Sequence, residues 1–553
     1  MIHQRRNDKE RTHLKKNRTP KKHKTLLSRS CSCLLYIIKF LRFVYDFVIT
    51  YIFDYLNSEV PIKKLPPVND DLVIQSCVTI VNKIKTRKVS CRYVVECFIK
   101  RINQVNSILN AVVDSRFKEA LSEADEYDKL IELADTEDKL NLIFDGKPLF
   151  GIPFTSKEST GAKGMAWTFG LKSRAGNKCN EDAEIVQSLK KAGAILIAIT
   201  NVPELNLWCE TRNKVYGQTN NPYDTTRTVG GSSGGETSIV SGCGSPLGLG
   251  TDIGGSARIP AFNCGVFGHK LTTGLINTKG MTYRMGTEKD TMVSAGPITK
   301  YAEDLTPVIK ALVGPEKSLE MKLDDEVELS SLKYFYVDDP KDLRLSAISD
   351  ELQMVLIRVV NSFNTLTDLP PQKINLPGLR YSYTLWRYWM TQEEDSDFPG
   401  ALGNQETRVS VWQEVPKLIV GQSNHTLAAI LKLIDLELPK VNETWAKAET
   451  EKLSEELTTL LSNDGVLFFP SSPTTAKHHY EPFFYPFNFA YWAIFNVLKL
   501  PVTQVPLGLG KNGLPLGIQV VAGKNQDRLC VAVSKHLEKI FGGWKSPFAI
   551  KTV

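Results

Sequence analysis

Histidine is scarce in this sequence of 553 residues, and metal-binding motifs are absent. There are eight histidines, no Cys-x-x-Cys pair and no His-Glu-x-x-His motif, and the adjacent His478 and His479 cannot share one face of a helix. No metal centre and no cofactor are therefore expected, and a catalytic base other than histidine is favoured. The ten cysteines lack a disulfide-like arrangement, which predicts free, mostly buried thiols.

The chain also lacks linkers between residues 70 and 545. This stretch contains no Pro-, Gly- or Ser-rich tract, no internal repeat and no low-complexity segment. We therefore expect one large α/β domain rather than several small ones. Helices are predicted over residues 72–101, 117–134 and 182–192, and buried strands over 194–200, 466–469 and 516–521.

Two glycine-rich bends, each containing serine, are the most informative feature of the sequence. Residues 230–235 read Gly-Gly-Ser-Ser-Gly-Gly, and residues 250–258 read Gly-Thr-Asp-Ile-Gly-Gly-Ser-Ala-Arg. Paired glycines allow sharp turns that bring backbone N–H groups close to a ligand, and consecutive amides can stabilise an oxyanion. Ser256 ends the second bend, in the position that a nucleophile would occupy.

A lysine follows an apolar segment upstream of these bends. Residues 150–158 read Phe-Gly-Ile-Pro-Phe-Thr-Ser-Lys-Glu, a strand-like run that would carry Lys157 into the interior. Burial disfavours the ammonium form and lowers the pKa of a lysine. Lys157 is therefore a candidate general base.

Together these motifs resemble the amidase signature family, whose catalytic set is a lysine, a serine entered through a cis peptide bond, and a nucleophilic serine. Lys157, Ser232 and Ser256 match this set at intervals of 75 and then 24 residues. The similarity extends from about residue 70 to the C-terminus. It includes residues 200–204 (Thr-Asn-Val-Pro-Glu), 296–299 (Gly-Pro-Ile-Thr) and 513–519 (Gly-Leu-Pro-Leu-Gly-Ile-Gln).

The resemblance implies a fold and a mechanism. The fold is a large twisted mixed β-sheet with helices on both faces, spanning residues 68–545, and the family also implies a homodimer. In the mechanism, neutral Lys157 takes a proton from Ser232, which takes that of Ser256, and an acyl-enzyme forms. The expected cis bond is Gly231–Ser232. The expected oxyanion donors are the amides of Ile253, Gly254, Gly255 and Ser256, with Ser233 bonding near Lys157 and an Asp252–Arg258 ion pair bracing the loop.

A different serine hydrolase is the competing interpretation of the first bend. Residues 230–234 also satisfy the Gly-x-Ser-x-Gly nucleophile elbow, which requires a preceding strand and a later acid and histidine. Residues 219–227 instead indicate turns. The histidines downstream, none in a distinctive setting, are His269, His425, His478, His479 and His536.

Charge separates the N-terminal region from the rest. Residues 1–30 hold eleven of the 68 Lys and Arg residues and two of the 61 Asp and Glu residues, so the remainder of the chain is nearly neutral. We expect a basic, disordered tail over residues 1–30. A nuclear signal or nucleic-acid arm is the alternative for such a tail, but the segment that follows argues for a membrane and against a nucleic-acid partner.

A hydrophobic segment over residues 31–57 is expected to anchor the protein to a membrane. Residues 34–53 are long enough to span a bilayer but contain Lys39, Arg42 and Asp46. Central charges oppose insertion unless the cations reach one interface. The charges share one helix face with Thr50, which equally fits a helix lying in the interface with its polar face toward water.

The side of the membrane stays open. A spanning segment would place the catalytic domain in the lumen, where Asn424 and Asn442 would be glycosylation acceptors. Unpaired cysteines instead favour the cytosolic face. No cleavable signal is expected, and an intracellular membrane, such as the endoplasmic reticulum or a lipid droplet, is the predicted location.

Aromatic residues point to a lipid substrate. They gather in residues 381–389 and 483–495, which could be core or could line an acyl channel, and the resemblance implies a channel formed near residues 380–440. The leading function is hydrolysis of fatty-acid amides, such as N-acylethanolamines and primary fatty amides. A glutamine-hydrolysing amidotransferase subunit and a catalytically silent lipid-binding protein are the alternatives.

Overall fold

A mixed β-sheet of eleven strands forms the centre of the protein. The computed structural model describes residues 26–367, 369–394 and 397–551, so most of the expected basic tail lies outside the described residues. The strands follow the spatial order β1 (Val112–Ser115), β3 (Ile195–Thr200), β2 (Pro153–Lys157), β6 (Leu247–Asp252), β8 (Ser294–Thr299), β7 (Phe267–Lys270), β12 (Val502–Leu509), β13 (Pro515–Ala522), β11 (Gly465–Pro470), β9 (Lys333–Tyr336) and β10 (Gln372–Lys373). A separate hairpin joins β4 (Arg212–Asn213) to β5 (Gly217–Gln218).

Strand direction changes along the sheet. Strand β2 is parallel to both β3 and β6, and β9 is parallel to β10 and β11. The central strands β6, β8, β7, β12 and β13 pair antiparallel to one another. Every residue of β2, β3 and β6 is buried, as expected for strands covered on both faces. The predicted mixed sheet, including the strands over residues 194–200, 466–469 and 516–521, is confirmed.

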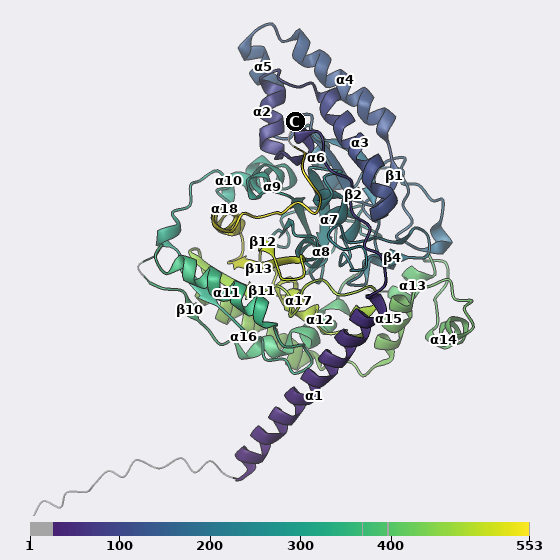
Figure 1. Ribbon diagram of the computed structural model, residues 1–553, viewed down its shortest axis with the longest axis vertical. Helices are drawn as coiled ribbons and strands as arrows, with labels where there is room; N and C mark the ends of the chain where they lie inside the picture. The colour runs from purple at the N-terminus through teal and green to yellow at the C-terminus, as the bar shows by residue number, and fades with distance from the viewer. Residues whose placement is uncertain (1–25, 368, 395–396, 552–553) are drawn as a thin grey trace, which may run out of the picture.

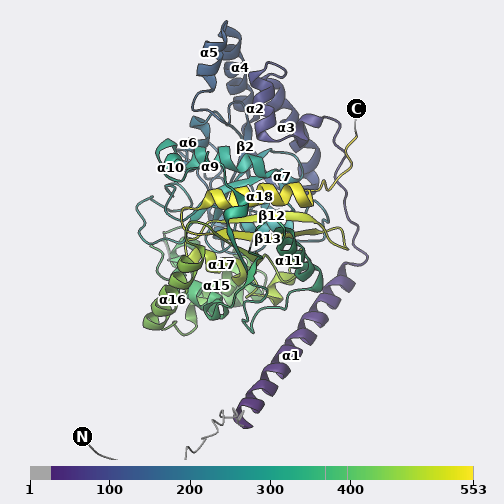
Figure 2. The same ribbon diagram turned by 90° about the vertical axis from the view of Figure 1, so that its left-hand side faces the viewer.

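Helices cover both faces of this sheet (Figures 1 and 2), and Figure 2 shows α18 (Asp527–Phe541) lying next to β12 and β13. The helices that follow α1 (Leu26–Asn57) are α2 (Cys77–Lys85), α3 (Cys91–Leu109), α4 (Phe117–Leu133), α5 (Glu137–Phe144), α6 (Glu184–Lys191), α7 (Gly234–Ser241), α8 (Arg258–Asn263), α9 (Leu305–Val313), α10 (Pro315–Glu320), α11 (Asp350–Phe363), α12 (Ser382–Met390), α13 (Phe398–Leu402), α14 (Val411–Ile419), α15 (Leu427–Glu437), α16 (Glu443–Leu461), α17 (Ala490–Val497) and α18 (Asp527–Phe541).

The prediction of a single helix over residues 72–101 was wrong, because this segment forms a 3₁₀ turn followed by the two helices α2 and α3. Each helix has its own N-cap: the hydroxyl of Ser76 accepts from Thr79 N, and that of Ser90 accepts from Tyr93 N. Arg87, between them, has a φ of 56°, which helical backbone excludes. Serine N-caps satisfy the first free amides of a helix, and here they override a continuous apolar pattern.

The thiols behave as predicted. All eight cysteines whose side chains are described are free, and seven of them are buried, with Cys209 half-buried. Cys31 and Cys33 lie outside the described side chains. Among the described residues, no group of His, Cys, Asp and Glu side chains is arranged to hold a metal ion.

Helix α1 (Leu26–Asn57) is a rod whose N-terminal half extends beyond the body of the protein (Figures 1 and 2). It begins before the hydrophobic segment that was expected from residue 31. Within the described residues, no helix combines the length and the apolar character needed to cross a membrane.

Polar side chains of α1 contact the body of the protein, which differs from the interfacial arrangement, one of the two alternatives, in which they would face water. Arg42 donates to Ser346 Oγ at 3.0 Å and pairs with Asp46 at 2.9 Å. Near the C-terminal end of the helix, Asp54 lies 2.9 Å from His478 Nε2. Arg42 and Asp54 therefore bind the body, and aromatic residues of the helix such as Phe40 and Tyr51 are left exposed.

Candidate active site

The parallel strands β2 and β6 end side by side and place the first polar groups of the site. Their register pairs Ser156 with Leu249, so Lys157 and Thr251 emerge at the same edge of the sheet. Lys157 Nζ donates to Thr251 Oγ1 at 2.7 Å and to Ser232 Oγ at 2.8 Å. The predicted proximity of Lys157 to Ser232, 75 residues apart, is thus present in the structure.

Lys157 is completely buried. This desolvation lowers the pKa of its ammonium group to about 7, although the charges of Asp252 and Glu236 oppose the shift. A large fraction of Lys157 is therefore neutral at neutral pH. The geometry and the pKa together equip this side chain to accept a proton from Ser232.

A buried carboxylate lies behind the lysine. Glu236, in the first turn of α7, accepts hydrogen bonds from Thr155 Oγ1 at 2.7 Å and from Thr200 Oγ1 at 2.6 Å. Burial raises its pKa to about 7, although these hydroxyls and Lys157 oppose the shift. Three neighbouring segments, β2, β3 and α7, are joined through this one side chain.

The two serine-containing bends meet at the edge of the sheet. The Gly231–Ser232 peptide is cis, as the resemblance implies, and Ser233 N donates to Ser256 O at 3.0 Å. A Cβ atom at Gly231 would lie 2.4 Å from Trp208 O, so the bend requires glycine here. Ser233 Oγ bonds Thr251 O at 3.4 Å, which brings it near Lys157 through Thr251 rather than by direct contact.

The bend that carries Ser256 rests on a buried ion pair. Arg258 donates to Asp252 through Nε and through NH2, both at 3.0 Å, and both side chains are fully buried. Burial alone would raise the pKa of Asp252, but the nearby Arg258 guanidinium outweighs it and lowers that pKa to about 2. Arg258 also donates to Asn496 and Gln519. The predicted Asp252–Arg258 ion pair is present in the structure.

The amides expected to hold an oxyanion differ in what they already bind. The N–H of Gly255 donates to Asp252 Oδ1 at 2.8 Å, and Gly255 adopts a φ of 109° that side chains disfavour. Within the described part of the chain, the N–H groups of Ile253, Gly254 and Ser256 make no such hydrogen bond. These three amides remain available to an incoming anion.

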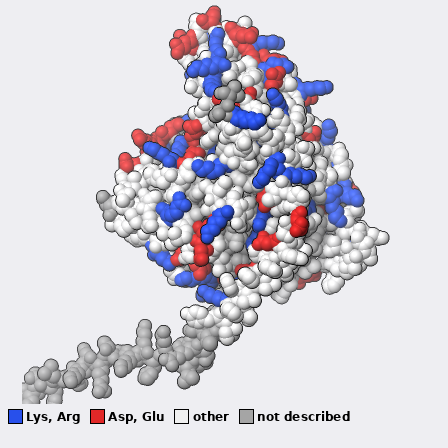
Figure 3. Space-filling model, in the orientation of Figure 1, with Lys and Arg blue, Asp and Glu red and all other residues white. Residues whose placement is uncertain are grey.

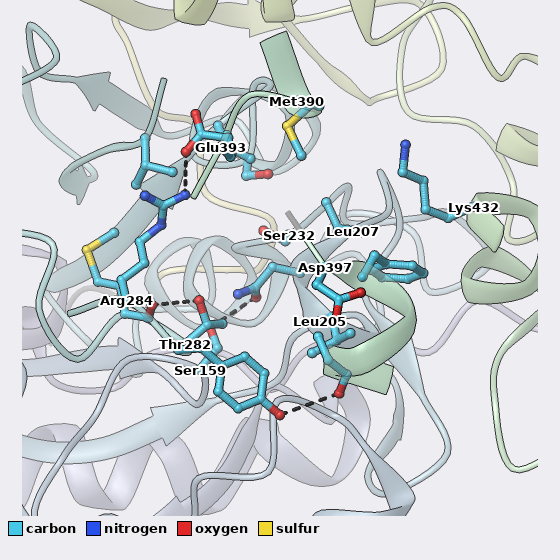
Figure 4. A pocket seen from close by; sticks show the side chains of 18 of the residues that line it. Ser159, Leu205, Leu207, Ser232, Thr282, Arg284, Met390, Glu393, Asp397 and Lys432 are labelled. Atoms are coloured by element: carbon cyan, nitrogen blue, oxygen red, sulfur yellow. Dashed lines mark hydrogen bonds and ion pairs between the residues drawn. The ribbon is translucent and has the colours of Figure 1, made fainter. Parts of the chain in front are cut away.

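Ser232 and Ser256 open into a cavity of about 620 Å³ (Figure 4), where Ser256 is half-buried. The structure records no hydrogen bond between the two serine hydroxyls among the described residues. Catalytic hydrogen bonds often tighten only when substrate is bound. The apolar residues of the cavity wall include Leu205, Leu207, Ile253, Met390, Phe398 and Leu436.

The region over residues 380–440 contributes to this cavity, whereas the aromatic clusters mainly pack on each other. Tyr383 stacks edge-on against Phe487, and Trp386 against Phe489. Trp386 Nε1 also donates to Ile253 O at 2.9 Å, which ties α12 to the bend before Ser256. The aromatic clusters are therefore part of the hydrophobic packing, and through Trp386 they support the bend that carries Ser256.

The histidine-dependent elbow is excluded by the positions of the downstream histidines. None of them contacts Ser232 or Ser256 among the described residues. Their recorded partners lie elsewhere: Asp527 for His269, Glu204 for His425, Asp54 for His478, Glu210 for His479, and the ring of Phe363 for His536.

Sequence patterns alone missed Thr251, Glu236 and Asn496. Thr251 and Glu236 lie within or beside the glycine-rich motifs, and this proximity was the only available signal. Asn496 donates to Asp252 across 244 residues, a contact that depends entirely on the tertiary fold. Gln519 is the last residue of the 513–519 motif on which the resemblance rests. Nothing in the sequence indicated that Arg258 would donate to it.

The mixed sheet, with Lys157 and the two serines gathered at one of its edges, is the arrangement of an amide hydrolase. The Amidase family model matches residues 93–531. Fatty-acid amide hydrolase 2-A of Danio rerio is 41% identical over 493 residues, covering 88% of this chain and 92% of that protein. Human fatty-acid amide hydrolase 2 is 40% identical over 490 residues, covering 87% and 92%. A solved structure titled "Fatty acid amide hydrolase" superposes with a TM-score of 0.69 at 20% identity, covering 90% and 89%.

The chain belongs to the amidase family and is an amide-hydrolysing enzyme. The family match spans most of the described residues, and the two relatives share about two fifths of their residues with this chain over nearly their full length. The resemblance drawn from Lys157, Ser232 and Ser256 is thereby confirmed at the level of the family.

Proposed function

We propose that this enzyme hydrolyses amides of long-chain fatty acids, such as N-acylethanolamines and primary fatty amides, with Ser256 as nucleophile. The observation that carries the proposal is the buried Lys157, with a pKa of about 7, bonded at 2.8 Å to a serine that shares a cavity with Ser256. The relatives named fatty-acid amide hydrolase 2 support the choice of acyl group.

The proposed reaction begins with proton transfer. Lys157 Nζ takes the proton of Ser232 Oγ, which takes that of Ser256 Oγ, and Ser256 attacks the amide carbonyl. The amides of Ile253, Gly254 and Ser256 stabilise the oxyanion, while Gly255 holds the bend through Asp252. Ser232 returns a proton to the departing amine, which leaves an ester on Ser256. Water, deprotonated by the same relay, then releases the fatty acid.

The cavity suits an acyl substrate. Its volume of about 620 Å³ falls within the range typical of sites for molecules of this size. Apolar side chains from three separate parts of the chain line it, among them Leu207, Met390 and Leu436. An alkyl chain can therefore be removed from water next to the reactive serines, which favours long acyl groups.

We also propose that the enzyme lies on a membrane through α1. Helix α1 carries exposed aromatic residues, with Phe40, Phe43 and Phe47 each 63% exposed. A second apolar surface lies on α14, where Trp412 and Ile419 are about four-fifths exposed, and Figure 3 shows mostly uncharged residues over this region. Exposed apolar faces of this kind are typical of proteins that bind a bilayer interface.

Turnover by the detergent-solubilised chain tests the proposal. Oleamide and N-oleoylethanolamine should release oleate, whereas glutamine should release no ammonia. Ammonia from glutamine without oleate release would favour the amidotransferase alternative. Binding of oleamide without turnover would favour a catalytically silent lipid-binding protein.

The resemblance also implies a homodimer, which stays a prediction. Analytical ultracentrifugation of the enzyme in detergent measures its oligomeric state.

A further inference from the structure

A buried carboxylate ties two distant parts of the cavity wall together. Glu204 begins a short 3₁₀ turn (Glu204–Asn206), and its side chain is 2% exposed. It lies 2.7 Å from His425 Nδ1, and it accepts from Thr426 N and Thr426 Oγ1, both at 2.7 Å. His425 and Thr426 immediately precede α15, more than 200 residues later in the sequence.

Both of the tied segments line the cavity. The turn contributes Leu205, Asn206 and Leu207, and α15 contributes Lys432, Leu436 and Glu437. Figure 4 shows Leu205, Leu207 and Lys432 on the same side of the cavity. Leu205 also packs into a small hydrophobic cluster with Leu433 of α15, separate from the main core. The turn and the helix thus form one wall.

The turn needs external support. Leu205 and Asn206 both have left-handed backbone conformations, with φ values of 51° and 60°, and Leu205 is a residue type that disfavours this region. The Glu204 carboxylate accepts from the amide of Thr426, the N-cap residue of α15, and adds negative charge at the N-terminus of an eleven-residue helix, where it is stabilising. One side chain therefore fixes the turn and the start of the helix relative to each other.

We propose that Glu204 is a positioning residue that determines acyl-chain selectivity by holding Leu205 and Leu207 against the α15 part of the wall. The inference rests on the proposed fatty-amide hydrolysis. Glu204 does not line the cavity and acts through the residues beside it. Cutting the tie separates the two apolar segments, so a long acyl chain loses contacts that a short one never makes.

Glu204→Gln tests this role in the full-length chain with butanoyl and oleoyl amides of the same amine. We expect KM for the oleoyl amide to rise about tenfold, the factor for losing roughly two buried methylene contacts. KM for the butanoyl amide, kcat, and the rate of Ser256 labelling by a small fluorophosphonate should stay within about twofold, because the reacting groups are unchanged.

Thr426 provides an independent variant. Thr426→Val removes the hydroxyl that donates to Glu204 while retaining the shape of the side chain, and it should shift the oleoyl-to-butanoyl KM ratio in the same direction. Thr426→Ser keeps the hydroxyl and should restore the wild-type ratio. This comparison decides the question even if Glu204→Gln fails to fold.

Asp527 provides a matched control. It is a fully buried carboxylate with the same kinds of partner, accepting from Thr272 N and Thr272 Oγ1 and lying 3.1 Å from His269 Nε2, but it does not line the cavity. Asp527→Asn should lower stability without changing the KM ratio.

The outcomes separate the two proposals. An unchanged KM ratio in both Glu204→Gln and Thr426→Val overturns the positioning role, as does an equal change in Asp527→Asn. Wild-type enzyme that hydrolyses the butanoyl but not the oleoyl amide overturns the proposed substrate class, and with it the inference, before any variant is compared.

Discussion

Lys157 is the side chain whose protonation should control the reaction. Its pKa is lowered to about 7 by burial, and only the neutral amine can accept a proton. We expect kcat/KM to increase about tenfold per pH unit below 7 and to level off above it, as for a single essential base. Steady-state rates with a non-ionising fatty amide between pH 5 and 9 measure this profile.

Two variants assign the pH profile to Lys157. Lys157→Ala should lose most of the activity together with the increase around pH 7, and an unchanged increase in this variant would point to another base. Glu236→Gln removes a charge that raises the pKa of Lys157. The midpoint of the pH profile of this variant should therefore move to lower pH. A midpoint at higher pH would contradict the interaction between Glu236 and Lys157.

The Asp252–Arg258 pair should contribute strongly to stability. Arg258→Met leaves Asp252 buried without its cation, and losing one partner of a buried pair costs about 3–5 kcal/mol in the free energy of unfolding. Chemical denaturation measures the change. The exposed pair Lys447–Glu443 is the matched control, and Lys447→Met should leave the unfolding midpoint unchanged. Equal midpoints for both variants would contradict this account.

The sequence was sufficient to propose the reactive side chains but not to predict their surroundings. Lys157, Ser232 and Ser256 could be predicted because two glycine-rich bends and two intervals agree with a known pattern. Thr251, Asn496 and Glu204 could not, because their contacts arise where strands and helices from distant segments meet. That the Gly255 amide already donates to Asp252 could likewise not be predicted, because this hydrogen bond depends on the backbone conformation of the bend.

The exposed aromatic residues of helix α1 give a testable prediction for membrane binding. Replacing Phe40, Phe43 and Phe47 by Ser removes three exposed aromatic rings from the helix. Sedimentation with phosphatidylcholine vesicles should then fall at least tenfold, because each buried ring contributes about 1.5–3 kcal/mol when fully removed from water. Turnover in detergent should be unchanged.

The control for this experiment lies at the opposite end of the molecule. Leu133 and Leu142, on α4 and α5, are 76% and 73% exposed, and Figure 1 places these helices far from the protruding end of α1. Replacing both by Ser should leave vesicle binding unchanged. Equal losses in the two variants would mean that binding follows general hydrophobicity rather than α1.

Predictions for individual elements succeeded where one local signal dominated. The apolar run at residues 194–200 matches β3, and the amphipathic stretch at residues 117–134 matches α4. The break between α2 and α3 was missed because two serine caps outweigh apolar periodicity. The packing of α1 on the body could not be predicted, because a single helix pattern does not reveal that Arg42 binds Ser346.

For the molecule as a whole, the catalytic body should be independent of α1. Among the residues whose side chains the structure describes, the main hydrophobic core begins at Leu65 and includes no residue of α1. Removal of residues 1–57 should lower the free energy of unfolding by no more than about 2 kcal/mol, because only a few partly exposed contacts are lost. Activity in detergent should persist while vesicle binding is lost. Failure of this shortened chain to fold would contradict the proposed division at residues 57–68.

The mixed sheet could be predicted from the family pattern, whereas the single catalytic domain expected from the absence of linkers stays a prediction. The order of strands in the sheet could not, since β7 lies between β8 and β12 only because distant segments pair. The packing of α13–α15 on the 204–207 turn is likewise a property of the assembled protein.

The central claim, that Ser256 is the nucleophile, is tested most directly by locating a covalent adduct. Wild-type enzyme treated with a fluorophosphonate and digested should carry the phosphonyl group on Ser256, as read by peptide mass spectrometry. Ser256→Ala should carry none, and Lys157→Ala should react far more slowly. An adduct on Ser232, or undiminished labelling in Ser256→Ala, would contradict the account.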